Sequence, residues 1–454
     1  MKLRHAASCA LAVSLASATA PLAQADTASD IAQLRKEMKS LKGDYEKRIH
    51  DLEVRLQKAE AKASDAEAKV DSQASTPVAA AEPPPAPPAP VAAPTAPTSQ
   101  SAFNPGISVA LNGTYNYAKR DPALAKIPGF VVADDAKLHD RGFSLDESEI
   151  TLSANVDHVL TAQMTASFDG QQGGVNIEEA YVQTLDLPAG LTAKAGRFFS
   201  GIGYLNERHS HDWQFMDAPL PYRAFLGNQY GDDGIGVRWL APTDFYLQFG
   251  AEWFRGDAFP AGNASNNGSG TYTAFAKTGD DINDEWSWLA GLSYLHTKAN
   301  QRDNNGDIFD GEDQTAIATA VLKWAKDGNP KESNLSLTGE YFFNAEKGQF
   351  NGTGVDLNRS GWYAQAVYQF DPQWSAGVRY ASLNGDSLPP ALTGSTLDDL
   401  GRTPNAITGL VEYDTSEFGR LRLQYTHDDS DVTGNDLLSV GYTIILGPHG
   451  AHRY

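Results

Sequence analysis

Residues 418–428 read FGRLRLQYTHD. Three apolar side chains, Leu421, Leu423 and Tyr425, alternate with arginine, glutamine and threonine. Because successive side chains of a β-strand point to opposite faces, such a strand has one apolar and one polar face. Alternation with a period of two over about 9–11 residues is typical of a strand that crosses a membrane inside a closed barrel.

The same alternation recurs along the chain from Gly106 to Leu446, in about 16 segments. The gaps between segments are short and long in turn. The long gaps are residues 119–144, 199–231, 255–270, 298–312 and 384–404. Short turns at one rim and long loops at the other are how outer-membrane barrels are built. The sequence therefore predicts an all-β transmembrane barrel of about 16 antiparallel strands over residues 103–454.

The first 102 residues show other sequence patterns than this alternation. Residues 1–25 combine an early positive charge, a short apolar run and Ala23-Gln24-Ala25, which predicts a cleaved signal peptide. Residues 26–75 are expected to form an α-helical, periplasmic coiled coil, because apolar or small residues recur in steps of three and four. That seam comprises Ile31, Leu34, Met38, Leu41, Tyr45, Ile49, Leu52, Leu56, Ala59, Ala63, Ala66 and Val70. Residues 76–102 are rich in proline and alanine, as in an extended linker.

Composition narrows the function classes. The net charge of −21 lies entirely in residues 101–454, so nucleic acid is not an expected partner. The sole cysteine, Cys9, falls within the signal peptide, so the mature chain has no disulfide. No catalytic motif such as G-x-S-x-G, a P-loop or H-E-x-x-H is present, and we do not expect an enzyme.

The order of signal peptide, coiled coil, linker and barrel resembles trimeric outer-membrane porins that carry an N-terminal periplasmic coiled coil. Three stretches resemble more closely a porin-like proteobacterial family whose members are labelled zinc-regulated outer-membrane receptors. These stretches are YEKRIHDLE at 45–53, GIGYLNERHSHDWQFMDAPLPYRAFLG at 201–227 and GPHGAHRY at 447–454. The resemblance implies a trimer in the outer membrane of a Gram-negative bacterium, with its N-terminal region in the periplasm.

Strand parity places a set of charged residues on the inner face of the barrel. Facing rows of opposite charge can set the selectivity of a pore. The predicted pore-lining residues are Lys194, Arg238, Glu252, Lys323, Glu340, Arg379, Glu412, Arg420 and Arg422. The long loop 199–231 is the candidate for an inward-folded constriction.

Metal binding is a second hypothesis. His209, His211 and Asp212 lie together in loop 199–231, and imidazole with a neighbouring carboxylate is a common zinc donor set. His449 and His452 near the end of the chain could also hold a cation. The acidic stretch 303–313 partly resembles a calcium loop, although Ile308 stands where glycine is expected. No cofactor is otherwise expected, so Zn²⁺ or Ca²⁺ in these loops is the open alternative.

Passive diffusion of small hydrophilic solutes or ions is the function that this pattern favours. Two alternatives stay open, a zinc-uptake channel that uses the loop histidines and a structural tether between the outer membrane and the cell wall. The expected partners are membrane lipids, further copies of this chain in a trimer, small solutes and, for the tether, the cell wall. Neither the solute nor the ion selectivity follows from the sequence.

The seam from Ile31 to Val70 generates the first prediction. A peptide of residues 26–75 should be helical and should self-associate, because a single helix would leave its apolar stripe exposed to water. Circular dichroism and sedimentation equilibrium measure both properties. A monomeric, unfolded peptide at high concentration would contradict the coiled coil.

Overall fold

The computed structural model describes residues 105–133, 136, 138–169, 174–185, 187–262 and 269–447. The predicted signal peptide, coiled coil and linker lie outside these residues, as do His449 and His452. Among the described residues, no helix is long and apolar enough to cross a membrane. The described residues all belong to one compact unit, which spans residues 96–454.

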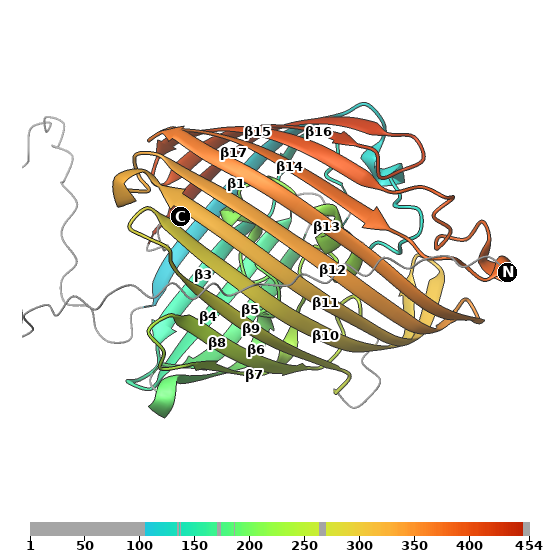
Figure 1. The fold of residues 1–454 in the computed structure, drawn as a ribbon, viewed down its shortest axis with the longest axis horizontal. Coiled ribbons are helices and arrows are strands. Elements are labelled where there is room, and N and C mark those ends of the chain that lie inside the picture. Colours follow the sequence, from blue (N-terminus) through green and yellow to red (C-terminus); the bar gives the residue numbers. More distant parts are fainter. Residues whose placement is uncertain are drawn as a thin grey trace, which may run out of the picture. The chain divides into compact units, whose positions relative to one another are not determined.

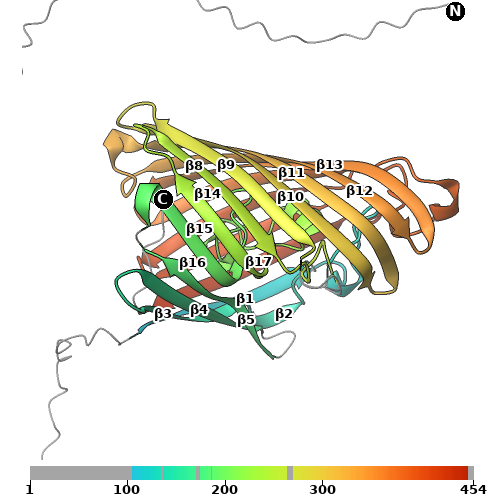
Figure 2. The same cartoon turned by 90° about the horizontal axis from the view of Figure 1, so that it is seen from below.

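The described chain forms one antiparallel sheet (Figures 1 and 2). Its strands are β1 (Gly106–Ala118), β2 (Gly142–Leu145), β3 (Ser148–Asn155), β4 (Leu160–Asp169), β5 (Gly174–Thr184), β6 (Leu191–Phe199), β7 (Gly231–Leu240), β8 (Tyr246–Phe254), β9 (Thr271–Asp281), β10 (Trp286–Asn304), β11 (Asp307–Ala325), β12 (Asn334–Phe350), β13 (Thr353–Asp371), β14 (Trp374–Asn384), β15 (Asn405–Ser416), β16 (Gly419–Asp428) and β17 (Asn435–Leu446). The helix α2 spans Leu220–Leu226. Short 3₁₀ turns occupy Pro122–Leu124, Pro188–Gly190, Ser210–Asp212, Lys326–Gly328 and Pro390–Leu392.

Pairing of the first and last strands closes the sheet into a barrel. Strand β1 pairs with β17 from Val109 opposite Leu446 to Ala118 opposite Leu437. On its other edge β1 pairs with both β2 and β3, which are two pieces of one interrupted strand. The 17 described strands therefore fill 16 positions around the ring. The predicted all-β barrel of about 16 antiparallel strands is confirmed.

The barrel wall is apolar outside and polar inside. On β16, Leu423 is 48% and Tyr425 49% exposed, whereas Arg422 is 5% and Gln424 4% exposed. A soluble protein shows the reverse, with its apolar side chains buried. An apolar outer face suits a lipid surround, and it confirms the alternation read from residues 418–428.

Loop lengths follow the predicted alternation with one error. Long loops follow β1, β6, β8 and β14, while short turns follow β3, β5, β7, β13 and β15. The predicted long loop 298–312 is wrong, because β10 and β11 continue to a tight turn at Asn305 and Gly306. Both turn residues have positive φ, 58° and 93°, which a type I′ hairpin requires and which Asn-Gly adopts readily.

The hairpins β10–β11 and β12–β13 reach beyond the neighbouring strands at the end that carries the long loops (Figure 2). The acidic stretch 303–313 belongs to the first of them. Within the described residues it does not form a group of three metal ligands. The calcium-loop reading thus loses its geometric basis, since a regular hairpin spreads alternate side chains to opposite faces.

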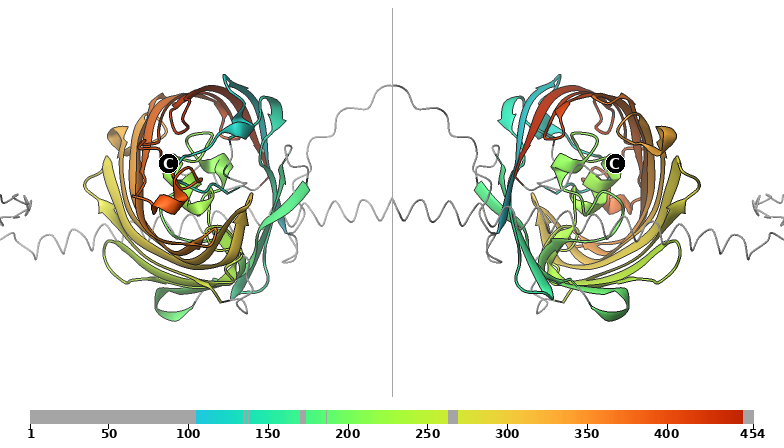
Figure 3. Two further views of the ribbon diagram at one scale, coloured as in Figure 1. Left: turned by 90° about the vertical axis from the view of Figure 1, so that its right-hand side faces the viewer. Right: turned by 90° about the vertical axis from the view of Figure 1, so that its left-hand side faces the viewer.

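The segment 200–230 between β6 and β7 folds into the barrel, where Figure 3 shows it with α2 inside the ring of strands. We call this segment the inner loop. Its apolar side chains pack against inward-facing residues of the wall, including Phe254, Phe275 and Phe342. One side of the lumen is therefore packed core.

The apolar outer face and polar inner face of the wall generate the second prediction. Leu423→Arg would place a guanidinium in lipid and should lower the free energy of unfolding by about 2–4 kcal/mol if the site lies near the bilayer midplane. Urea titration of the protein refolded in lipid vesicles measures the change. The matched control is Ser439→Arg, opposite Gln424 on the inner, polar face of β17. Equal destabilisation by both variants would contradict the orientation of the wall.

Candidate functional site: the inner loop and its contacts

Local sequence explains how the inner loop is shaped. Pro219 and Pro221 begin α2, and proline is tolerated in the first helical turn because the N–H it lacks would have no partner there. Gly227 ends α2 with φ +62°, a conformation that favours glycine. This short helix presents Tyr222 toward the wall strands β12 and β13.

A buried carboxylate, Glu340 on β12, fixes the centre of the loop. Its Oε1 accepts hydrogen bonds from the Tyr204 amide at 2.8 Å and the Thr319 hydroxyl at 2.7 Å. Its Oε2 accepts from the Tyr222 and Tyr363 hydroxyls, both at 2.7 Å. Two of these donors belong to the loop and two to the wall. Glu340 therefore ties the loop to the barrel.

A second group of charges holds the start of the loop. Arg238 on β7 bonds Glu207 of the loop and lies 3.4 Å from Glu252 on β8. Glu252 accepts hydrogen bonds from the Ser200 hydroxyl and from the Gly201 amide, the latter at 3.1 Å. Burial opposes ionisation of Glu207, but the Arg238 guanidinium holds the pKa of that carboxyl below its usual range.

A third group holds the middle of the loop on the opposite wall. Arg379 on β14 donates to Asp217 Oδ1 at 2.6 Å, and Gln424 donates to the same oxygen at 2.6 Å. Although burial opposes ionisation, Arg379 keeps the pKa of Asp217 below its usual range. Arg420 and Arg422 donate to backbone carbonyls of the loop, at His211 and Trp213.

Seven of the nine predicted pore-lining residues thus face the inner loop or one another. Glu412 lies 3.6 Å from Arg420 and belongs to the third group. The two exceptions are lysines. Lys194 lies over the Tyr181 ring, 4.3 Å from its centroid, and Lys323 borders a cavity of ≈ 420 Å³ beside Tyr204 and Arg208. Sequence parity indicated the inward direction of these residues, but it could not show that most of them contact a loop.

A cavity of ≈ 820 Å³ lies beside the inner loop. It lies between the loop and the wall formed by β1, β4, β5, β6, β16 and β17. Its charged lining comprises His139, Asp140, Asp146, Glu147, Glu178, Arg197, Asp217, Arg223 and Arg422. The lining is polar, and carboxylates outnumber guanidinium groups.

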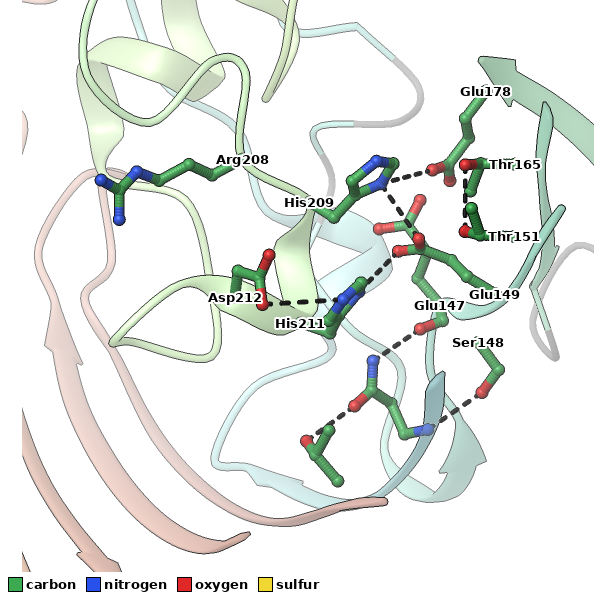
Figure 4. A network of polar contacts seen from close by, with 12 residues as sticks. Glu147, Ser148, Glu149, Thr151, Thr165, Glu178, Arg208, His209, His211 and Asp212 are labelled. Carbon is green, nitrogen blue, oxygen red and sulfur yellow. Dashed lines mark hydrogen bonds and ion pairs between the residues drawn. The ribbon is translucent and has the colours of Figure 1, made fainter. Parts of the chain in front are cut away.

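At one edge of this cavity, two histidines of the loop meet glutamates of the wall (Figure 4). His209 Nδ1 lies 3.0 Å from Glu149 Oε2 and 3.3 Å from Glu178 Oε2, while His209 Nε2 lies 3.1 Å from Glu179 Oε2. His211 Nδ1 lies 2.9 Å from Glu149 Oε1. We call these residues, with Glu147, the histidine–glutamate cluster.

A bulge in the sheet, together with strand alternation, brings the glutamates together. Between β4 and β5 the register shifts at Thr165, so that Glu178 is an extra, bulged residue beside Glu179. Both side chains are nine-tenths buried and contact His209. Glu147 lies two residues before Glu149, so ordinary alternation of the extended chain places it on the same side. A β-bulge re-aims a side chain in this way and is common next to functional sites.

The predicted metal ligands are partly brought together. Among the described residues, the group whose ligand atoms lie within 4.8 Å of one another is Glu149, Glu178 and His209. His211 is beside it, and Asp212 lies 3.7 Å from His211 Nε2. Burial alone would lower the pKa of His209, but the surrounding carboxylates raise that pKa well above its ordinary value.

Sequence reasoning missed Glu147 and Glu178 as members of the site. Strict alternation assigns Glu178 to the lipid face, because its neighbour Glu179 faces inward. A carboxylate at a lipid-facing position is costly. Two adjacent glutamates in an otherwise alternating strand were therefore the available signal for a bulge.

No family model matches the chain. A protein of Aquifex aeolicus (strain VF5), described as an uncharacterized protein, is 30% identical over 391 residues, which are 78% of this chain and 81% of that protein. An anion-selective porin from Comamonas acidovorans superposes with a TM-score of 0.50 at 12% identity, covering 76% of this chain and 99% of the porin. OprB of Pseudomonas putida gives a TM-score of 0.49 at 15% identity, covering 76% and 94%. The Comamonas acidovorans likeness shows the porin barrel fold; the resemblance to the zinc-regulated receptor family stays a prediction.

The Glu340 contacts generate the third prediction. Glu340→Gln replaces one acceptor oxygen with an amide that cannot accept, so at least one buried donor loses its partner at a cost of about 1–3 kcal/mol. The inner loop should then be cut faster by protease in the folded, detergent-solubilised protein, and the melting temperature should fall. Glu312→Gln, at an exposed position on β11, is the matched control. Unchanged cleavage in Glu340→Gln would show that this carboxylate does not hold the loop.

Proposed function

The chain belongs to the same family as the uncharacterized Aquifex aeolicus protein, and we propose that it is a porin for passive diffusion of small hydrophilic solutes or ions across an outer membrane. The proposal concerns the pore inside the barrel. It rests on the wall, the cavity and the inner loop, each of which supports it in a different way.

The observation that carries the proposal is the polar cavity of ≈ 820 Å³ beside the inner loop. At about 30 Å³ per water molecule, a space of this size has room for tens of waters. Its charged lining would keep that water in place, because dry cavities in proteins are apolar. A hydrated space inside an apolar wall is what a diffusion pore requires.

The inner loop gives the pore its limit on solute size. It is anchored by Glu340, by Glu252 and by Arg379, which lie on three separate stretches of the wall. A loop held at so many points would act as a fixed constriction. We therefore propose diffusion limited by size and charge.

Location and assembly belong to the same proposal. An even number of strand positions returns both ends of the barrel to one side of the membrane, which would place the N-terminal region in the periplasm. The heptad seam predicted in residues 26–75 supports a parallel trimer. A tether that links the membrane to the cell wall would use the same helix and would need no open pore, so conductance separates the two functions.

The fourth prediction is an open channel with a preference for cations. Full-length protein in planar bilayers should give stepwise conductance, and reversal potentials under a salt gradient should favour cations at low salt, because carboxylates dominate the cavity lining. The preference should fade as salt rises and the Debye length falls from about 30 Å at 0.01 M to about 3 Å at 1 M.

A pair of variants tests the source of that preference. Asp140→Asn removes a charge at the cavity and should reduce cation selectivity, whereas Asp356→Asn, exposed on β13 in the extracellular hairpin, should not. Bilayers that stay silent with correctly folded protein would support the tether. Anion selectivity at low salt would assign control of the pore to the inner arginines instead.

A further inference from the structure

The histidine–glutamate cluster holds more negative charge than its own partners can neutralise. It contains four carboxyl groups, of Glu147, Glu149, Glu178 and Glu179, and two imidazoles. Even with both imidazoles protonated and one proton shared between Glu147 and Glu178, carboxylates still outnumber the cationic groups of the cluster. Uncompensated charge away from bulk water is strongly unfavourable. The carboxyls of Glu147 and Glu178 moreover contact each other, which ionised groups do only with a shared proton or cation between them.

The geometry around His209 Nδ1 also favours a cation within the cluster. That single ring nitrogen faces oxygens of two different glutamates, Glu149 at 3.0 Å and Glu178 at 3.3 Å. One N–H can be directed well at only one of them. Glu149 Oε2 is buried and lies close to the ring without hydrogen-bond geometry, and Glu178 Oε1 is buried with no hydrogen-bond donor other than a proton shared with Glu147. The side chains of these glutamates are only 2% and 10% exposed.

The surroundings hold these donors in place as a metal site requires. With Nδ1 turned toward the proposed ion, His209 Nε2 can keep its proton and donate it to Glu179, 3.1 Å away. Glu179 is itself held by Gln163 at 3.2 Å. Such a carboxylate behind a histidine ligand fixes the tautomer and the ring orientation. His211 contacts the other oxygen of Glu149 in a similar supporting position.

We propose that Glu149, Glu178 and His209 bind one divalent transition-metal ion, with Zn²⁺ the best match, and that Glu179 and His211 orient these ligands. One imidazole nitrogen with two carboxylates is a donor set that suits zinc, whereas calcium and magnesium prefer oxygen alone. Three protein ligands leave a position for water, so the ion can exchange. The inference does not rest on the porin function, since binding is measured without transport.

A bound ion would connect three parts of the molecule. Glu149 belongs to β3, Glu178 to the bulge of β5 and His209 to the inner loop. Glu178 and Glu147 also line the ≈ 820 Å³ cavity. The ion would therefore clamp the inner loop to the wall at the border of the space through which solutes would pass.

Isothermal titration calorimetry with Zn²⁺ provides the fifth prediction and its test. The protein is untagged, full-length, folded in detergent and stripped with a chelator, and it carries His449→Gln and His452→Gln so that the tail imidazoles do not contribute. We expect one Zn²⁺ per chain. Glu178→Gln and His209→Gln should each lower the affinity by at least about 10- to 100-fold, the range seen even for residues that only orient ligands. Co²⁺ should bind at the same site with visible absorption bands that both variants lose.

The matched control is His427→Gln. His427 also pairs with a carboxylate, Asp436 at 2.8 Å, but it lies on the exposed outer face of β16. Its affinity for Zn²⁺ should equal that of the parent protein, and heat-modifiable gel mobility confirms that each variant is a folded barrel. Absence of binding in the parent protein, equal binding in both cluster variants, or displacement of Zn²⁺ by a modest excess of Ca²⁺ would each overturn the proposal.

Discussion

A lipid surround offers no hydrogen-bond partner to the backbone, and this constraint governs the whole molecule. The antiparallel pairing of β1 with β17 satisfies it, because the closed ring has no free strand edge. Closure in turn forces every second side chain inward. Arg422, Gln424 and Glu340 therefore need partners inside the barrel. The inner loop supplies them, so its position is a consequence of how the wall is built.

Polar groups of the loop and of the wall provide each other with hydrogen-bond partners. Backbone carbonyls at His211 and Trp213 receive the guanidinium groups of Arg420 and Arg422, while Glu340 receives the loop amide of Tyr204. Charge-assisted hydrogen bonds of this kind are about twice as strong as neutral ones. In a wide lumen, only water would solvate these charged side chains of the wall. In this barrel, backbone dipoles of the inner loop solvate them. A polar cavity remains between the loop and the wall strands β1, β4, β5 and β6.

The sequence was sufficient to predict the structure where one periodicity of side chains holds along a strand. Alternation at 419–428 and 106–118 predicted strand direction and the inward face, because register and lipid exposure are tied together by a period of two. It failed where one residue departs from the period. Asn305-Gly306 was absorbed into a supposed acidic loop, although Asn-Gly is a strong hairpin signal. The bulge at Glu178 was missed because strict alternation was assumed through the adjacent Glu178 and Glu179. The convergence of that glutamate with His209, 31 residues away, depends on a loop path that no local pattern encodes.

The anchors of the inner loop also constrain the order in which the protein can fold. They lie on strands from β3 to β16, so contacts such as those of His211 with Glu149 and of Asp217 with Arg379 span much of the chain. Hairpins such as β10–β11 join neighbours in sequence and can form early, whereas widely separated contacts pay the entropy of closing long segments first. Docking of the loop therefore requires strands from β3 to β16 to lie in place, and we expect it to occur late in folding.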